Sequence, residues 1–227
     1  MVSNTNQKAK KVADEFARWV TFQYHDFKEF QTLFGGPAKR YELLEKTARY
    51  FFKDLFWMYI DHIILNVSKL TDPPQIGGHQ TFSIHSVHNY FKCYPGYRTK
   101  DAKTLISNID NKAKKVRTWR DKLEAHYDWH HAIGDENVSD KFVLSDFEVL
   151  YDDLRKYVEL LFSSVFNEVK PIDMVPLQGV DELIGALKES QALRDLKNRD
   201  INAYSNRIAS EPMIQLPRRL RYSPDLR

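Results

Sequence analysis

The chain contains few residues that cross-link or interrupt a polypeptide. Its 227 residues include a single cysteine, Cys93, which excludes an internal disulfide and any zinc site built from several cysteines. Glycine and proline number 8 and 9, and they cluster between long stretches of helical periodicity. Almost no stretch alternates apolar and polar residues with the period of two that is typical of strands. The sequence therefore predicts an all-α fold with few, long helices.

Long uninterrupted apolar runs are also missing. The most apolar segment, "FFKDLFWMYIDHIILNV", is interrupted by Lys53, Asp54, Asp61 and His62. Charged groups are costly in hydrocarbon, so this segment predicts a buried core helix rather than a membrane span. The first residues, "MVSNTNQKAKKVADEF", have no apolar core of the kind that a signal peptide needs. Together with the single cysteine, these features indicate a cytoplasmic protein with no membrane partner.

Helical periodicity organises residues 1–168 into one predicted domain. The second of its helices is apolar on most sides, so we expect it to be the central and most buried one. The short helix begins with a Thr or Ser cap, and Ser145 with Glu148 has the spacing of a capping box. The predicted bundle has four long helices and one short helix, at about Gln7–Leu33, Ala38–Ser68, 81–91, Asp101–His131 and 145–167.

The composition changes after residue 168. The stretch "VDELIGALKESQALRDLKNRDINAYSNRI" has the pattern of a modest amphipathic helix, and the chain ends in the proline-spaced basic segment "EPMIQLPRRLRYSPDLR". We therefore divide the chain into a helical domain at 1–168 and a C-terminal extension at 169–227. The extension is predicted to be an amphipathic helix followed by a flexible basic tail.

An arginine occupies an apolar position in the helix predicted at 101–131. Arg120 lies four residues after Val116 and three before Leu123, inside a stripe that also contains Leu105, Ile109 and Tyr127. An unpaired buried cation costs several kcal/mol. Arg120 must therefore be paired with an acid, solvated in a cleft, or used in a function.

Two interpretations of Arg120 and the nearby His126 remain open from the residues alone. In the structural one, Arg120 forms a salt bridge with Asp54 or Asp61 of the second helix, and His126 is a packing residue. In the functional one, the Arg fork binds a phosphate, and the imidazole removes a proton from a hydroxyl near neutral pH. Spacing alone does not decide between them.

Other constellations give weaker signals. His126 and His130 have the spacing of a two-histidine zinc site, but no third ligand is evident, so we expect no metal ion there. His130 is expected to line the cleft or to pack. The stretches "FGGP" and "IGGH" lack the pattern of a phosphate-binding loop, and no cofactor is expected. The histidines at 79, 85 and 88 are predicted to be polar surface or capping residues.

Three stretches carry a resemblance to a known family. "RDKLEAH" at 120–126 places an Arg, a polar residue and a His at the spacing of the HEPN superfamily motif, in which four to six residues separate the Arg from the His. "SKLTDPPQIGGHQTFSIHSV" at 68–87 and "EAHYD" at 124–128 resemble the abortive-infection AbiU-type branch of that superfamily. The resemblance extends over about 10–168.

The resemblance implies a HEPN-like bundle that acts as a metal-independent endoribonuclease. Arg120 would bind the scissile phosphate, His126 would act as general base or acid in attack by the ribose 2′-hydroxyl, and Asp121 would orient the pair. It also implies a prokaryotic defence or toxin–antitoxin role for a homodimer, with RNA as substrate and an antitoxin or nucleotidyltransferase as partner. The alternatives are a non-catalytic HEPN module that binds RNA, nucleotide or protein, and a helical interaction protein assembled through 51–67 and the basic tail.

Basic residues precede the motif, although the whole chain is nearly neutral. The 34 basic and 31 acidic residues give a net charge of +3, so any contact with nucleic acid must be local. The stretch "KAKKVRTWR" at 112–120 contains no acid. Its side chains are expected either to guide a phosphate backbone and stack a base or to form a solvated helix face. The residues assigned to RNA binding are Lys112, Lys115, Arg117, Trp119 and, further along, His130.

Overall fold

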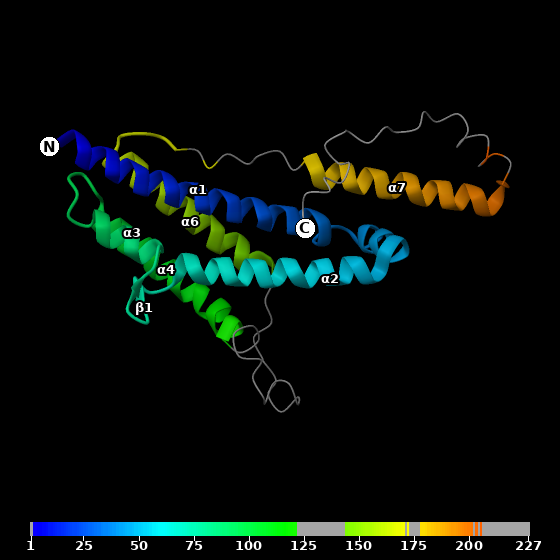
Figure 1. Ribbon diagram of the computed structural model, residues 1–227, viewed down its shortest axis with the longest axis horizontal. Coiled ribbons are helices and arrows are strands. Elements are labelled where there is room, and N and C mark those ends of the chain that lie inside the picture. Colours follow the sequence, from blue (N-terminus) through cyan, green and yellow to red (C-terminus); the bar gives the residue numbers. More distant parts are fainter. Residues whose placement is uncertain are drawn as a thin grey trace, which may run out of the picture. The chain divides into compact units, whose positions relative to one another are not determined.

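The computed structural model describes residues 2–121, 144–170, 172, 178–201, 203 and 205. These residues are almost entirely helical, which confirms the predicted all-α class (Figure 1). The chain divides into two compact units, 1–181 and 182–227, while the predicted domain boundary after residue 168 stays a prediction. The elements are α1 (Val2–Phe34), α2 (Ala38–Thr71), β1 (Gln75–Ile76), β2 (His79–Gln80), α3 (Ile84–Phe91), α4 (Thr99–Trp119), α6 (Leu144–Val165) and α7 (Gln178–Arg199).

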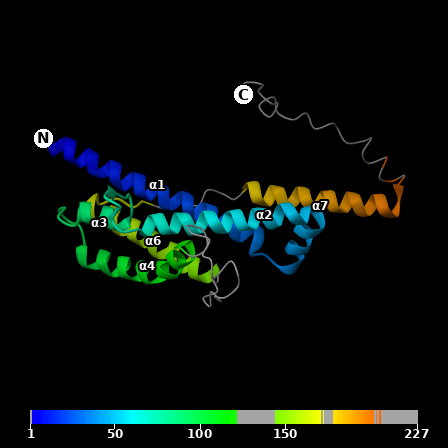
Figure 2. The same cartoon turned by 60° about the horizontal axis from the view of Figure 1, so that its bottom comes forward.

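The core of the first unit lies between α1 and α6, with α4 and the end of α2 packed against them (Figures 1 and 2). Aromatic side chains join the two central helices. The rings of Phe27 and Tyr151 stack with centroids 5.2 Å apart, and Phe16 meets Tyr157 edge to face at 5.8 Å. All four side chains are fully buried. Their spacing along each helix follows the apolar periodicity of the sequence, so α1 and α6 form the hydrophobic centre.

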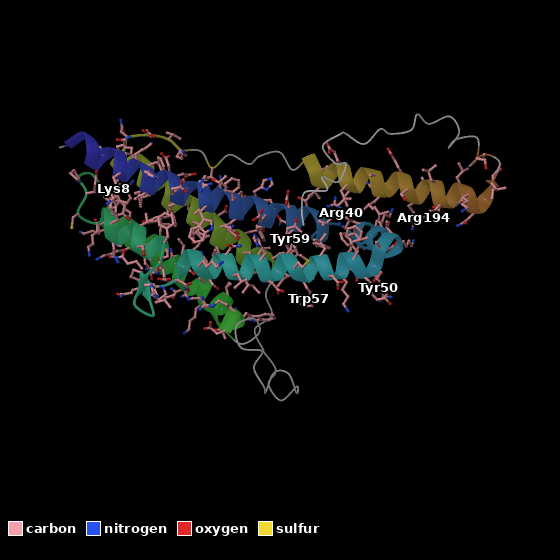
Figure 3. All side chains as sticks on the ribbon, in the orientation of Figure 1. Lys8, Arg40, Tyr50, Trp57, Tyr59 and Arg194 are labelled. Atoms are coloured by element: carbon pink, nitrogen blue, oxygen red, sulfur yellow. The ribbon has the colours of Figure 1, made fainter. Side chains whose placement is uncertain are left out.

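The prediction that α2 is the most buried helix is wrong. Its backbone is kinked at Ala48, where φ is −158° and ψ is 70°, and only its last third is continuously packed in the core. Tyr50 and Trp57, on its outer part, are 80% and 51% exposed (Figure 3). An outer helix can bury one face only, so a helix that is apolar on most sides leaves the rest in solvent. None of the described helices has the length and apolarity needed to cross a bilayer.

The helix ends agree with the sequence at one position and differ at another. Ser83 caps α3 as predicted, because its hydroxyl accepts a hydrogen bond from the backbone N–H of Ser86 at 3.5 Å. Ser145 is not the cap of α6, since it lies inside that helix. The carboxylate of Glu148 instead accepts a hydrogen bond from the Gln31 amide of α1 at 2.5 Å. Tertiary contact with α1 thus replaces the predicted capping box.

The loop after α2 contains a small hairpin that the sequence did not predict. β1 and β2 pair in antiparallel register, with Ile76 opposite His79. Gly77 and Gly78 form the turn with φ values of 55° and 84°, which residues with a side chain rarely adopt. The hairpin is followed directly by the cap of α3. It therefore connects the end of α2 to the helix that packs beside α4.

Candidate active site

The guanidinium group of Arg120 is held by two carboxylates. Arg120 lies at the C-terminal end of α4, where the last turn widens to the π type. Its Nη1 donates to Asp72 Oδ1 at 2.8 Å, and its Nε donates to Asp121 Oδ1 at 2.9 Å. The Arg120 side chain is 24% exposed, so it is neither buried in the core nor free in solvent. The pairing that the apolar stripe required is present, but Asp54 and Asp61 do not provide it.

The end of α2 holds a second arginine one turn earlier on α4. Arg117 Nη1 donates to the backbone carbonyl of Thr71 at 3.0 Å and to its hydroxyl at 2.9 Å. Asp72, which follows Thr71, caps the C-terminus of α2 and binds Arg120. The preceding Leu70 is fully buried and anchors this segment in the core. The "LTD" stretch at 70–72 therefore holds both arginines through Thr71 and Asp72.

The electrostatics keep Arg120 charged. Burial alone would lower the pKa of its guanidinium group, but hydrogen bonds and charge interactions with Asp72 and Asp121 outweigh burial and raise it. A guanidinium group has three nitrogens, and two of them already bind carboxylates. It carries five N–H donors in all, and these two bonds use one donor each on Nε and Nη1, so a phosphate can still bind Nη1 and Nη2 with both carboxylates in place. Of the two carboxylates, Asp72 is the more enclosed, with a side chain that is 11% exposed against 57% for Asp121.

A hollow of about 450 Å³ is lined by Arg117, one turn before Arg120 on α4. His85 from α3 and Asp110 from α4 form a pair in its wall, with Nε2 and Oδ1 3.1 Å apart. A second hollow of about 450 Å³ shares His85 and Asp110 with the first. Lys114 lines the first hollow, while Lys92 and Lys103 line the second. The two hollows together border a basic surface between α3 and α4, which we call the α3–α4 groove.

The four described residues among those assigned to RNA binding point to different neighbours. Lys112 forms an ion pair with the buried Asp153 of α6, and Lys115 lines a separate hollow of about 320 Å³ between α4 and α6. Arg117 faces the end of α2 instead. Trp119 is partly buried and packs against the core. The structure thus places Arg117 beside Arg120 and directs the two lysines toward α6.

Two of the predicted site residues, His126 and His130, lie outside the described residues. Asp121 is described, and its contact with Arg120 is compatible with the orienting role that was predicted for it. Sequence reasoning missed Asp72 and the His85–Asp110 pair as parts of this region. Asp72 had one detectable signal, since it is the first acid after a long apolar helix. His85 had none, because its partner comes from another helix.

His88 corrects the expectation that the histidines around the hairpin are surface residues. It is 9% exposed, and its Nδ1 lies 2.9 Å from the hydroxyl of Tyr97, which in turn lies 3.1 Å from that of Tyr157. Burial lowers the pKa of His88, with smaller contributions from Lys103, His85 and Lys92. His88 is therefore a packed core histidine that joins α3 to α6. His79, by contrast, is exposed in β2.

The comparison with protein families agrees with this arrangement. The HEPN_AbiU2 family model matches residues 10–186, which include both α2 with its "LTD" end and the Arg120 motif. The chain belongs to the AbiU2 family of HEPN proteins. The match confirms the resemblance inferred from the sequence and extends past residue 168, where that resemblance was expected to end. Neither the curated proteins nor the solved structures contain a match to this AbiU2 chain.

Proposed function

We propose that this AbiU2 protein is a metal-independent endoribonuclease of prokaryotic defence or toxin–antitoxin type. The observation that carries the proposal is the position of Arg120. It occupies the Arg position of the HEPN motif, it is held by Asp72 and Asp121, and it lies one turn from a hollow large enough for a nucleotide unit. A held, charged guanidinium group is suited to stabilise the charge that develops on a phosphate.

The proposed reaction uses the nucleophile that RNA itself carries. His126 removes the proton from the ribose 2′-hydroxyl, and the 2′-oxygen forms a bond to the scissile phosphorus. The bond from phosphorus to the 5′-oxygen breaks, and a protonated group, which the second motif of a homodimer would supply, gives its proton to that oxygen. Arg120 neutralises the phosphate during the step, and Asp121 keeps the guanidinium group oriented. The products are a 2′,3′-cyclic phosphate and a 5′-hydroxyl.

The α3–α4 groove supports RNA as the substrate class. It begins at Arg117, next to Arg120, and three exposed lysines line its hollows: Lys92, Lys103 and Lys114. Basic side chains spaced along a groove bind a phosphate backbone without reading its sequence. In this arrangement the groove guides the strand, whereas Lys112 is engaged by Asp153. The proposed partners are RNA, a second copy of the chain, and an antitoxin or nucleotidyltransferase.

The decisive experiment is cleavage of a defined single-stranded RNA by the full-length chain in EDTA. Wild type is compared with Arg120→Ala and His126→Ala, and the new 3′ ends are analysed. We expect cyclic phosphate ends from wild type and a loss of cleavage of at least about 100-fold in each variant. Arg18→Ala and His79→Ala are matched controls, since both residues are exposed and distant from the motif in sequence.

Two outcomes would reject the nuclease. Cleavage that survives both motif substitutions would assign the activity to a contaminant. RNA or nucleotide binding without cleavage would favour the second candidate function, a non-catalytic HEPN module. One observation supports that second candidate: two nitrogens of Arg120 are already bound by carboxylates, as in a structural salt bridge.

A further inference from the structure

We propose that α1 carries a divalent transition-metal site made by His25, Asp26 and Glu29. The site is independent of the Arg120 motif and of the proposed nuclease activity. One ligand atom from each of the three residues lies within 4.8 Å of the others. Their side chains are 24%, 30% and 28% exposed, so an ion can reach them from solvent while they remain largely held by the fold.

The spacing on α1 suits a single ion. His25 and Glu29 are four residues apart on one face of the helix, with Nδ1 and Oε1 separated by 3.8 Å. Bonds of about 2.0–2.2 Å in a tetrahedral site place two ligand atoms roughly 3.3 Å apart. The three side chains therefore need to close by only about 1 Å each, which rotation about their own bonds allows. A water molecule would complete the coordination.

Two side chains of α2 already orient the carboxylates. The Tyr59 hydroxyl donates to Glu29 Oε2 at 3.2 Å, and the Nε2–H of His62 donates to Asp26 Oδ2 at 2.9 Å. Tyr59 lies on the side of α2 that faces α1 (Figure 3). Tyr59 and His62 each bind one oxygen of a carboxylate, and the other oxygen of that carboxylate is left to bind an ion. Outer donors of this kind are typical of metal sites, where they fix the direction of the ligands.

The negative charge of the Asp26 and Glu29 carboxylates also favours binding of a cation. Among the described residues, no lysine or arginine forms an ion pair with Asp26 or Glu29, although the two carboxylates lie close together. Their negative potential reaches neighbouring side chains. Tyr151 is fully buried, and its hydroxyl makes no hydrogen bond in the described part of the chain. Burial and then the charge of Asp26 raise its pKa.

The ligand types favour Zn²⁺ over Mg²⁺. One imidazole with two carboxylates suits a borderline ion, and affinities for such sites rise toward the end of the first transition row. Mg²⁺ prefers an octahedron of oxygen ligands and keeps several of its waters. A bound Zn²⁺ would fix Asp26 and Glu29, and through His62 and Tyr59 it would hold the outer part of α2 against α1. The expected role is therefore a clamp between these helices.

The test is calorimetric titration of the full-length chain, stripped with EDTA and freed of any tag, with ZnCl₂ and separately with MgCl₂. We expect one Zn²⁺ per chain, a higher melting temperature in Zn²⁺, and no comparable effect of Mg²⁺. Absence of stoichiometric Zn²⁺ binding by wild type would overturn the proposal. The nuclease proposal is tested separately, because its cleavage assay contains EDTA.

Variants locate the ion. Glu29→Gln keeps an acceptor for Tyr59 but removes the charge, so Zn²⁺ affinity should fall by at least about tenfold, whereas Glu15→Gln on the same helix leaves it unchanged. Tyr59→Phe should also weaken Zn²⁺ binding by about 10–100-fold, with little change in the melting temperature of the metal-free chain. Binding that persists in Glu29→Gln but is lost in a His126→Ala, His130→Ala double variant would assign the ion elsewhere and refute the site.

Discussion

Arg120 at the end of α4 donates a hydrogen bond to Asp72 at the end of α2, 48 residues earlier in the chain. This contact joins the C-terminal ends of two helices, where the last backbone carbonyl groups have no partner within their own helix. It also determines where the guanidinium group lies relative to the α3–α4 groove. The pair is therefore both a structural contact and the fixed point of the candidate active site.

The first prediction concerns the stability that this pair provides. Asp72→Ala removes a carboxylate with an 11% exposed side chain and leaves Arg120 without its more buried partner. We expect the free energy of unfolding to fall by about 1–3 kcal/mol, as for the loss of a charged hydrogen bond. Asp121→Ala is the control, with an expected loss below about 0.5 kcal/mol because Asp121 is exposed. Urea unfolding of both variants measures the difference, and equal losses would contradict the prediction.

The sequence predicted that Arg120 needs a partner but not which residue it is. The apolar stripe contains only positions along one helix, so it shows that a charge at Arg120 needs a partner but not where that partner lies. The choice of Asp54 or Asp61 followed from the expectation that α2 is central. The kink at Ala48 and the exposure of the outer part of α2 depend on packing with other helices, which a local pattern does not contain.

Features within one helix could be predicted from the sequence, whereas contacts between helices could not. The periodicity of α1 and α6 was sufficient to predict helices and an all-α bundle, since each helix shows its apolar face in its own residues. The pairs Lys112–Asp153 and His85–Asp110 join different helices, so no stretch of sequence shows them. The run at 112–120 contains no acid, yet folding brings acids from α2 and α6 to it.

The second prediction tests the α3–α4 groove as the RNA path. Lys114→Glu in an inactive His126→Ala background should weaken binding of a single-stranded RNA several-fold. The slope of log affinity against log salt should become shallower by roughly 1 or more, because one phosphate contact is lost. Fluorescence anisotropy across a salt series measures both quantities. Lys8→Glu, an exposed charge reversal on α1, is the control (Figure 3). Equal effects of the two reversals would show that only overall charge matters.

The third prediction concerns the pH dependence of stability. Burial lowers the pKa of His88 in the folded chain relative to its ordinary value of 6.5. The unfolded chain therefore binds a proton more readily, and His88 reduces the stability as the pH falls through 6.5 toward the lower folded pKa. His88→Asn, which retains a polar atom near Tyr97, should show a smaller loss of unfolding free energy between about pH 7 and pH 5, a range that brackets the ordinary value of 6.5. His79→Asn should behave as wild type, and a dependence unchanged in His88→Asn would refute the assignment.

The fourth prediction separates the core of the bundle from the outer part of α2. Phe27 is fully buried and stacks on Tyr151, whereas Phe51 is 60% exposed although it belongs to the most apolar run of the chain. Phe27→Ala should lower the free energy of unfolding by about 3–5 kcal/mol, because it removes buried apolar surface and leaves a cavity. Phe51→Ala should cost less than about 1 kcal/mol, since most of that ring is already in contact with water. Urea unfolding of dilute protein measures both losses.

A loss for Phe51→Ala as large as that for Phe27→Ala would show that the outer part of α2 is covered in solution, for example by a second copy of the chain. The loss would then depend on protein concentration, which repeating the measurement at tenfold higher concentration would reveal.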